Sequence, residues 1–428
     1  MILTDTLIPD WVSTTNIYEV NLRQYTKEGT FKAFARHLPR LKDMGVEVIW
    51  FMPVTPISIK NRKGDLGSYY ACSSYVQTNP EFGTIDEFKG MVDQIHGLGM
   101  KVIIDWVANH TGWDHEWTIA HPEFYNKNED GTFKPPVENW EDVIHLNFNN
   151  TQLREAMIDA MKFWVDECNI DGFRCDMAML VPLDFWLQAR KELDAVRPLF
   201  WLGEFDQWGN DEPYARAFDV SYSWHWMHIS ETFYRNKLKL AVLDEALIGY
   251  QYKQPYHHIR SFFTSNHDEN SWNGTEYEKY GDAAIPFAVF SCMWNGIPLI
   301  YSGQEIPNQK RLAFFDKDEI KWTSNPKFHQ FYQTLLRFRK QHPALKAANR
   351  SVITWRIATT ELENLFSFVR KAGTREVITI LNFSNHKHKF HINDSRLAGS
   401  FIDLFTGQEH SIKEQFVIPA WGYLILHK

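Results

Sequence analysis

The chain has 428 residues, of which 44% are hydrophobic, and a formal net charge of −8 at neutral pH. This length suits two or three domains, one of them large enough to be a single barrel. The acidic balance, with no basic cluster, argues against nucleic acid or an anionic membrane as a partner. Aromatic residues make up 15% of the chain; their rings can pack in a core or against the apolar faces of sugars.

The expected elements alternate between strand-like and helix-like segments from about residue 16 to residue 341, which is typical of parallel βα units. The expected strands are 16–20, 46–51, 101–106, 172–175, 199–203, a run near 217–220, 259–264 and 297–301. The expected helices include 30–44, 85–98, 151–169, 183–196, 282–294 and one near 326–341. Eight such units predict an α/β protein built on a (β/α)8 TIM barrel.

Two regions depart from this alternation. The stretch 110–147 has little periodicity and is too long for an ordinary connection, so we interpret it as an insertion after the third strand. After about residue 348, short β-prone runs separated by turn residues predict an antiparallel β-sandwich. The predicted division is therefore 1–106 and 148–347 for the two parts of the barrel, 107–147 for an inserted domain, and 348–428 for the C-terminal β domain.

The cysteines and the apolar segments bear on the compartment. The four cysteines are widely spaced, with no metal-type Cys-x-x-Cys pair, which predicts free thiols and a reducing compartment. The first ten residues show neither a basic segment nor a long apolar run, so no signal peptide is visible. Pro286 and Pro298 interrupt the uncharged stretch 283–301, which favours a buried helix and strand over a membrane span. We expect a cytoplasmic protein, or a periplasmic or secreted one if a leader has been removed.

Three carboxylates, Asp176, Glu204 and Asp268, each follow a short apolar, strand-like segment. Loops at the C-terminal ends of parallel barrel strands open into one mouth, so we expect the three acids to share a cleft. A single acid in such a place is as typical of a helix N-cap or a solvated loop. Three acids in matched settings instead indicate an enzyme.

The chemistry of glycoside hydrolysis with retention fits these acids, because it needs two carboxyl groups about 5 Å apart. Asp176 suits the nucleophile, since Arg174 lies on the same strand face and would keep the aspartate ionised. Glu204 follows an apolar run, and such a setting raises the pKa of a carboxyl so that it can act as the acid/base. Asp268, beside His267, suits sugar binding and stabilisation of a positively charged transition state.

Several motifs occur in one order along the chain. They are Asp105-Trp-Val-Ala-Asn-His110, Gly172-Phe-Arg-Cys-Asp176, Gly203-Glu204, Thr264-Ser-Asn-His-Asp268 and, at the eighth strand, residues 296–305. Together with residues 67–84 they resemble the short signature regions of the alpha-amylase superfamily of retaining glycoside hydrolases. The resemblance implies a (β/α)8 barrel with a domain B inserted after strand 3 and an antiparallel domain C. It also implies Asp176 as nucleophile, Glu204 as acid/base and Asp268 as transition-state stabiliser.

The resemblance further implies a set of substrate-binding residues. Arg174 matches the arginine that supports the nucleophile, and Tyr70 aligns with the tyrosine that stacks on the sugar in subsite −1. His110 and His267 match histidines that hydrogen-bond this sugar, although a lone histidine is more often structural. Asp105 matches an acid that orders the site internally.

Calcium is the metal that many members of this family bind between the barrel and domain B. Their ligands include the equivalent of Asn109 and an aspartate, where this chain has His145. Calcium prefers hard, mostly anionic oxygen ligands, so we expect no cofactor and no metal requirement, with calcium as the open alternative. The chain also has Met179-Leu180 where many starch-degrading members have Lys-His, so recognition of the leaving side must differ.

Four tryptophans are candidates either for sugar platforms or for packing of the insertion and its surroundings; they are Trp113, Trp117, Trp140 and Trp208.

The predicted function is cleavage of alpha-1,4-glucosidic bonds in an alpha-glucan or maltooligosaccharide through a glycosyl-aspartate intermediate. Glucosyl transfer and isomerisation of maltose use the same intermediate and remain alternatives. A different class is the non-catalytic barrel subunit of a transporter. Such subunits lack parts of the triad, whereas all three acids and Arg174 are present here.

Overall fold

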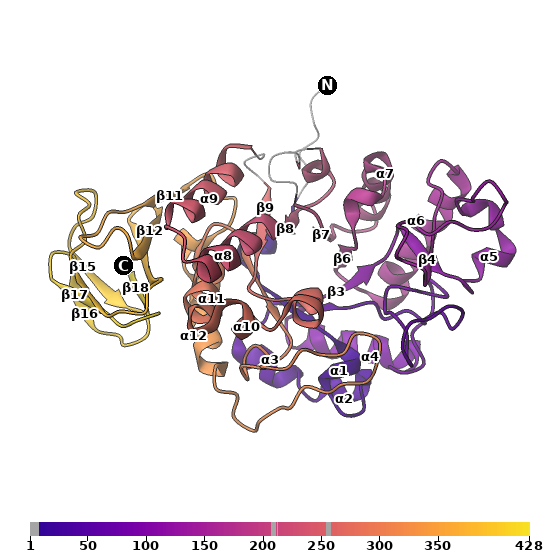
Figure 1. Cartoon of the computed structure of the whole chain (residues 1–428), viewed down its shortest axis with the longest axis horizontal. Helices are drawn as coiled ribbons and strands as arrows, with labels where there is room; N and C mark the ends of the chain where they lie inside the picture. The colour runs from indigo at the N-terminus through magenta and orange to yellow at the C-terminus, as the bar shows by residue number, and fades with distance from the viewer. Residues whose placement is uncertain (1–7, 207–210, 212, 254–257) are drawn as a thin grey trace.

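A closed barrel of eight parallel strands forms the centre of the molecule (Figure 1). The computed structural model describes residues 8–206, 211, 213–253 and 258–428. In barrel order the strands are β1 (Ile17–Val20), β10 (Ile297–Tyr301), β9 (Ile259–Phe262), β8 (Val220–Tyr222), β7 (Phe200–Gly203), β6 (Gly172–Cys175), β3 (Lys101–Trp106) and β2 (Val48–Phe51). The predicted (β/α)8 barrel is confirmed.

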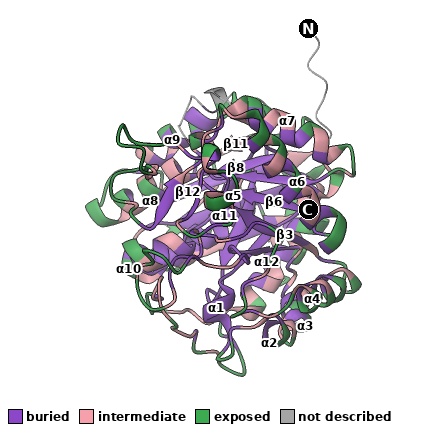
Figure 2. Ribbon diagram, turned by 90° about the vertical axis from the view of Figure 1, so that its right-hand side faces the viewer, coloured by how far each residue is buried: buried purple, intermediate pink, exposed green. Residues whose placement is uncertain are grey.

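The strands are buried along almost their whole length, which is why they read as continuous apolar runs in the sequence (Figure 2). Alternate residues point into the barrel, where Val48, Ile103, Phe200 and Leu202 belong to one apolar cluster. Gly172 is required where β6 meets β7, because a Cβ there would lie 2.0 Å from the carbonyl oxygen of Phe200.

Helices cover the outside of the barrel (Figure 1). The principal ones are α2 (Phe31–Ala35), α3 (Leu38–Met44), α4 (Ile85–Gly97), α6 (Thr151–Cys168), α7 (Leu183–Asp194), α8 (Trp224–Asn236), α9 (Ala241–Lys253), α11 (Ala284–Met293) and α12 (His329–Gln341). The prediction of one helix over 30–44 is wrong, since α2 and α3 are separate. Pro39 explains the break, because its ring would clash with the carbonyl of Ala35 in a continuous helix.

The insertion after β3 is built on an antiparallel hairpin of β4 (His110–Gly112) and β5 (Val143–His145), with the short helix α5 (Trp117–Ala120) between them. At the other end of the molecule lies the C-terminal β domain (Figure 1). The residue boundaries of the predicted domains stay a prediction.

The C-terminal domain contains a six-stranded antiparallel sheet and a two-stranded one. In sheet order the six strands are β11 (Val352–Arg356), β12 (Leu365–Ala372), β13 (Arg375–Asn382), β18 (Tyr423–His427), β15 (Ser400–Asp403) and β16 (Glu409–Ser411). The pair is β14 (His388–Phe390) with β17 (Phe416–Ile418). Both sheets contribute to one apolar cluster that includes Ile378, Phe390 and Phe416. The predicted antiparallel domain is confirmed.

No helix in the described ranges combines the length and the apolarity that a bilayer-spanning segment needs.

Candidate active site

Arg174 joins three strands at the C-terminal end of the barrel. It lies on β6, pairs in register with Asp105 on β3, and has a fully buried side chain. Its Nη1 lies 2.9 Å from Asp105 Oδ1 and 2.9 Å from Asp176 Oδ1, and its Nη2 lies 2.8 Å from Glu204 Oε2. Because β3 and β7 flank β6 in the barrel, one guanidinium holds carboxyl groups from three adjacent strands.

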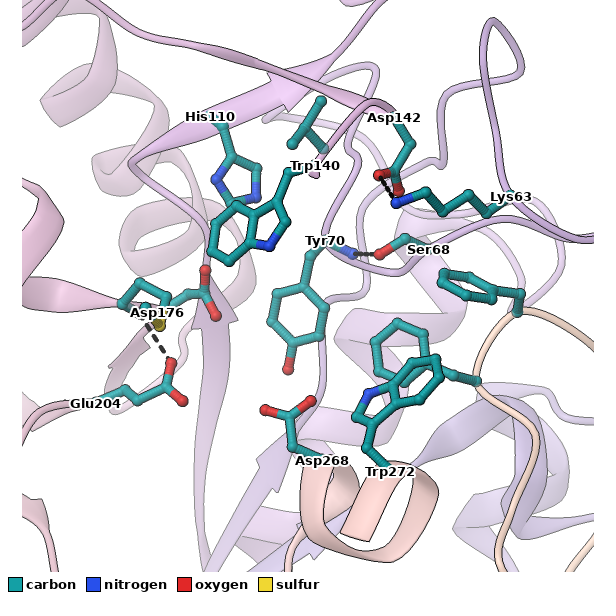
Figure 3. Close-up of a pocket in the computed structure, with 14 residues that line it drawn as sticks. Lys63, Ser68, Tyr70, His110, Trp140, Asp142, Asp176, Glu204, Asp268 and Trp272 are labelled. Carbon is teal, nitrogen blue, oxygen red and sulfur yellow. Dashed lines mark hydrogen bonds and ion pairs between the residues drawn. The ribbon is translucent and has the colours of Figure 1, made fainter. Parts of the chain in front are cut away.

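A cavity of about 440 Å³ opens at this end of the barrel. Asp176, Glu204 and Asp268 all line it, so the structure brings together the three acids that the sequence singled out (Figure 3). Asp176 and Glu204 lie on one side of the cavity, and Asp268 lies beside the hydroxyl end of Tyr70 (Figure 3). Two carboxyl groups on one guanidinium and facing one cavity can act on a single bond.

The five predicted substrate-binding residues fall into two groups, one that lines the cavity and one that lies below its surface. Tyr70 and His110 line the cavity, whereas Asp105, Arg174 and His267 lie beneath it. The Tyr70 hydroxyl donates to Asp105 Oδ2 at 3.0 Å and lies 2.7 Å from His267 Nε2. The deeper residues therefore position the residues that line the cavity.

Glu19 is a member of this network that sequence reasoning missed. It lies on β1 with a fully buried side chain, and its Oε1 is 2.5 Å from His267 Nδ1. Burial opposes charge on His267, but the carboxylates of Asp268 and Glu19 outweigh it and raise the pKa of His267 to about 9. The imidazolium can then donate from Nδ1 to Glu19 and from Nε2 to the Tyr70 oxygen. The signal in the sequence was an acid two residues after Ile17, at an inward-facing position of an apolar strand.

The two carboxyls on Arg174 have different acidities. Burial raises the pKa of Glu204 to about 7, in spite of the opposing charge of Arg174. Burial also raises the pKa of Asp176, to about 6, with Arg174 again opposing. Near neutral pH the pair therefore favours an ionised Asp176 and a Glu204 that still carries a proton for part of the time.

His110 is held neutral. Burial and the nearby His145 lower its pKa to about 3. Its Nδ1 lies 3.2 Å from Asn109 Nδ2, and its ring meets the Trp140 ring edge to face at 5.5 Å. A neutral imidazole at the cavity wall can hydrogen-bond a hydroxyl without adding positive charge.

Charge at the site is predominantly negative. Five acids, which are Glu19, Asp105, Asp176, Glu204 and Asp268, surround the cations of Arg174 and His267. An excess of carboxylates, already in place around a buried centre, favours a reaction in which positive charge develops.

Other lining residues were not among the site residues predicted from the sequence. They are Lys63, Ser68, Asp142, Val143, Met177, Trp272, Phe314 and Phe315. Of the candidate tryptophans, Trp140 lines the cavity, whereas Trp113 and Trp117 pack against aromatic rings of the insertion. Trp208 lies outside the described residues.

At the positions compared above with a calcium site, the side chains hydrogen-bond to other protein groups. His145 Nδ1 lies 3.0 Å from Asn126 Nδ2, and Asn109 is turned to His110. Burial and the positive charge of Lys134 lower the pKa of His145, and a neighbouring ammonium also opposes a divalent cation. Among the described residues, no group of three or more acids, histidines or cysteines is arranged to hold a metal.

Comparison with known proteins agrees with this geometry. A model of the alpha amylase catalytic domain matches residues 10–140 and 139–323. The chain belongs to the alpha-amylase family of glycoside hydrolases.

Two solved amylase-family structures superpose over nearly the whole chain. One is the crystal structure of an alpha-amylase from Lactobacillus plantarum, with 28% identity, a TM-score of 0.88, and coverage of 98% of this chain and 99% of that one. The other is that of a maltogenic alpha-amylase, AmyB, from Thermotoga neapolitana, with 29% identity, a TM-score of 0.88, and coverage of 97% and 99%. Alpha-amylase MalA of Haloarcula japonica is 26% identical over 88% of this chain, which spans 56% of that relative's length.

Replacing Arg174 tests whether this guanidinium holds the site together. Arg174→Met leaves three buried carboxyls without their cation, and we expect it to lower the free energy of unfolding by about 3–5 kcal/mol at pH 8. The deficit should shrink at pH 5. Loss of the cation raises the pKa of each carboxyl further above its value in the unfolded chain. The contribution of such a group to the free energy of unfolding falls as pH rises through its folded pKa, so the variant loses most at high pH.

Urea unfolding at both pH values measures this difference. The control is Arg235→Met, which removes a half-exposed ion pair with Glu231 and should change stability by less than about 1 kcal/mol. A deficit for Arg174→Met that is equally large at pH 5 and pH 8 would contradict the electrostatic account.

Proposed function

We propose that this amylase-family chain is a retaining glycosidase that cleaves alpha-1,4-glucosidic bonds of maltooligosaccharides and starch-type glucans. The observation that carries the proposal is that Asp176 and Glu204 share one guanidinium and line one cavity. Family membership and the amylase names of the relatives support the choice of alpha-glucan substrate.

In the first step an Asp176 oxygen attacks the anomeric carbon while Glu204 gives its proton to the glycosidic oxygen. The bond between the anomeric carbon and that oxygen breaks, the leaving sugar departs as an alcohol, and the glucosyl group is esterified to Asp176. Arg174 stabilises the carboxylate form of Asp176, so the nucleophile is ready before substrate binds.

The second step reverses these roles. Glu204, now ionised, takes a proton from water, and the resulting oxygen nucleophile attacks the anomeric carbon and releases Asp176. A sugar hydroxyl in place of water would give transfer instead of hydrolysis. In both steps the sugar passes through an oxocarbenium-like state, whose positive charge the carboxylates of Asp176 and Asp268 stabilise.

Hydroxyl groups of the sugar in subsite −1 are bound by the side chains that line the cavity. Tyr70 presents its ring as a stacking face. Hydrogen bonds of its hydroxyl with Asp105 and His267 fix the orientation of the ring. His110 and Asp268 supply a neutral and an anionic partner for hydroxyl groups. Asp105, Arg174, His267 and Glu19 act through these residues and are positioning residues.

We also propose a cytoplasmic location and no calcium requirement. All four cysteines are buried and unpaired, as expected in a reducing compartment. The surroundings of His145 and Asn109 support the second proposal.

Removal of the nucleophile should abolish turnover. We expect Asp176→Asn to lower kcat on maltoheptaose at least about 10³-fold, because an amide cannot form the glycosyl ester. Chromatography of the products measures the rate, and Asp130→Asn, in an exposed turn, serves as a control with unchanged activity. Near wild-type turnover by Asp176→Asn would refute the mechanism.

The pH profile should follow the two carboxyls. Rate falls on the acid side near pH 6 as Asp176 gains a proton, and on the alkaline side near pH 7 as Glu204 loses one. A plot of kcat/KM against pH should therefore be bell-shaped, with a maximum between these values. Activity that still rises at pH 9 would exclude a protonated Glu204 as the acid.

Calcium depletion should have little effect. Because the Asn109 and His145 region is satisfied by protein hydrogen bonds, dialysis against EDTA should leave both Tm and kcat unchanged. A fall in Tm that added calcium reverses would show that these residues do bind the ion.

A further inference from the structure

One side of the cavity is lined by three segments that are distant in sequence, here called the wall. They are the loop 59–66, which follows β2, the segment 139–142 of the insertion, and residues 314–316, which follow β10. Lys63, Trp140, Asp142, Phe314 and Phe315 present side chains from these segments to the cavity.

Lys63 connects the loop 59–66 to the insertion. Its Nζ lies 3.1 Å from Asp142 Oδ1 and donates to the Asn139 carbonyl at 3.2 Å (Figure 3). The loop is also tied to the insertion by its backbone, because the amides of Ile59 and Lys60 donate to Asp114 Oδ2 at 2.9 and 3.1 Å.

The other end of the loop is bonded to residues 314–316. The Leu66 amide donates to the Phe315 carbonyl at 3.0 Å, and the Asp65 amide donates to Asp316 Oδ1 at 2.8 Å. Beneath both segments lies the buried Arg23, whose guanidinium donates to the carbonyls of Gly67 and Phe314.

These contacts make the wall part of the folded structure. A part-exposed ion pair such as Lys63–Asp142 contributes at most about 1 kcal/mol, whereas each backbone hydrogen bond contributes a similar amount and there are several. Removing Lys63 should therefore open the cavity locally while the loop itself stays in place.

The position of the wall relative to Glu204, the acid/base, determines which part of the substrate the wall contacts. Glu204 protonates the departing oxygen, so the leaving part of the substrate lies on the side of Glu204. Lys63 and Asp142 lie on the far side of Tyr70 from Glu204 (Figure 3). The wall therefore faces the part of the substrate that is transferred to Asp176.

We propose that this wall closes the glycone end of the site, so that a free non-reducing chain end must rest against Lys63 and Asp142. The proposal rests on the proposed function, since it assumes that Glu204 is the acid. An ammonium and a carboxylate side by side offer both a donor and acceptors to the terminal hydroxyl groups of a glucan.

The consequence is exo action with a short product. The whole cavity, of about 440 Å³, lies in the lower part of the usual range for ligand sites, so a chain that ends against the wall would place only one or two glucosyl units before the scissile bond. Substrates without a free non-reducing end, such as cyclodextrins, should then be poor.

Two maltoheptaosides test this inference on the full chain, one with a free non-reducing end and one with that end blocked by a 4,6-ethylidene group. We expect the free substrate to be cleaved at least about tenfold faster, with glucose or maltose as the first product. Equal rates, or first products of three or more glucosyl units from the non-reducing end, would overturn the inference while leaving the proposed function intact. Failure to cleave either substrate would count against the proposed function itself.

The double variant Lys63→Ala, Asp142→Ala assigns the effect to the wall. It should bring the ratio of the two rates toward one and lengthen the first product. Lys60→Ala, three residues earlier on the same loop and outside the cavity, should leave ratio and product unchanged. If the double variant does not fold, Lys63→Ala alone serves, because that side chain is 38% exposed. An unchanged ratio and product in a folded variant would refute the role of the pair.

Discussion

The buried guanidinium of Arg174 is the interaction on which the rest of the site depends. Three acidic groups from adjacent strands would repel one another and resist burial if no cation lay between them. Arg174 permits them to approach because its planar group offers Nη1 to both Asp105 and Asp176, and Nη2 to Glu204. The barrel supplies the geometry, since parallel pairing in register places inward-facing residues of β3, β6 and β7 side by side.

The same burial that demands a cation also sets the acidities needed for catalysis. Exclusion of water raises the pKa of both Asp176 and Glu204, and Arg174 limits the rise. A second charged layer, formed by His267 with Glu19 and Tyr70, fixes the opposite side of the cavity. Substrate thus meets side chains whose positions and charges are already set, which is how electrostatic stabilisation of a transition state is achieved.

Much of the fold could be predicted because parallel barrel strands are buried on both faces and are therefore uniformly apolar. The strands 101–106, 172–175 and 297–301 were predicted to the residue. The strand expected near 217–220 instead covers Val220–Tyr222. A short apolar segment does not define its own ends, which are set by its pairing with the neighbouring strand β7. The region 30–44 has the apolar periodicity of one helix, but Pro39 divides it into two.

The site was only partly predictable for a related reason. Asp176, Glu204 and Asp268 follow strands, and position in the barrel brings such residues together whatever lies between them. Lys63 and Asp142 instead reach the cavity from loops that are brought together only by contacts between distant segments. Glu19 lies inside a strand, where the only signal is an acid at an inward-facing position, and its role becomes clear once its partner His267 is placed beside it.

The most direct measurement is to trap the covalent intermediate with 5-fluoro-α-D-glucosyl fluoride and to identify the modified peptide by mass spectrometry. The account predicts one fluoroglucosyl group attached to Asp176, with the label lost in Asp176→Asn. Label on another carboxylate, or turnover that yields the inverted anomer with no labelled peptide, would contradict it.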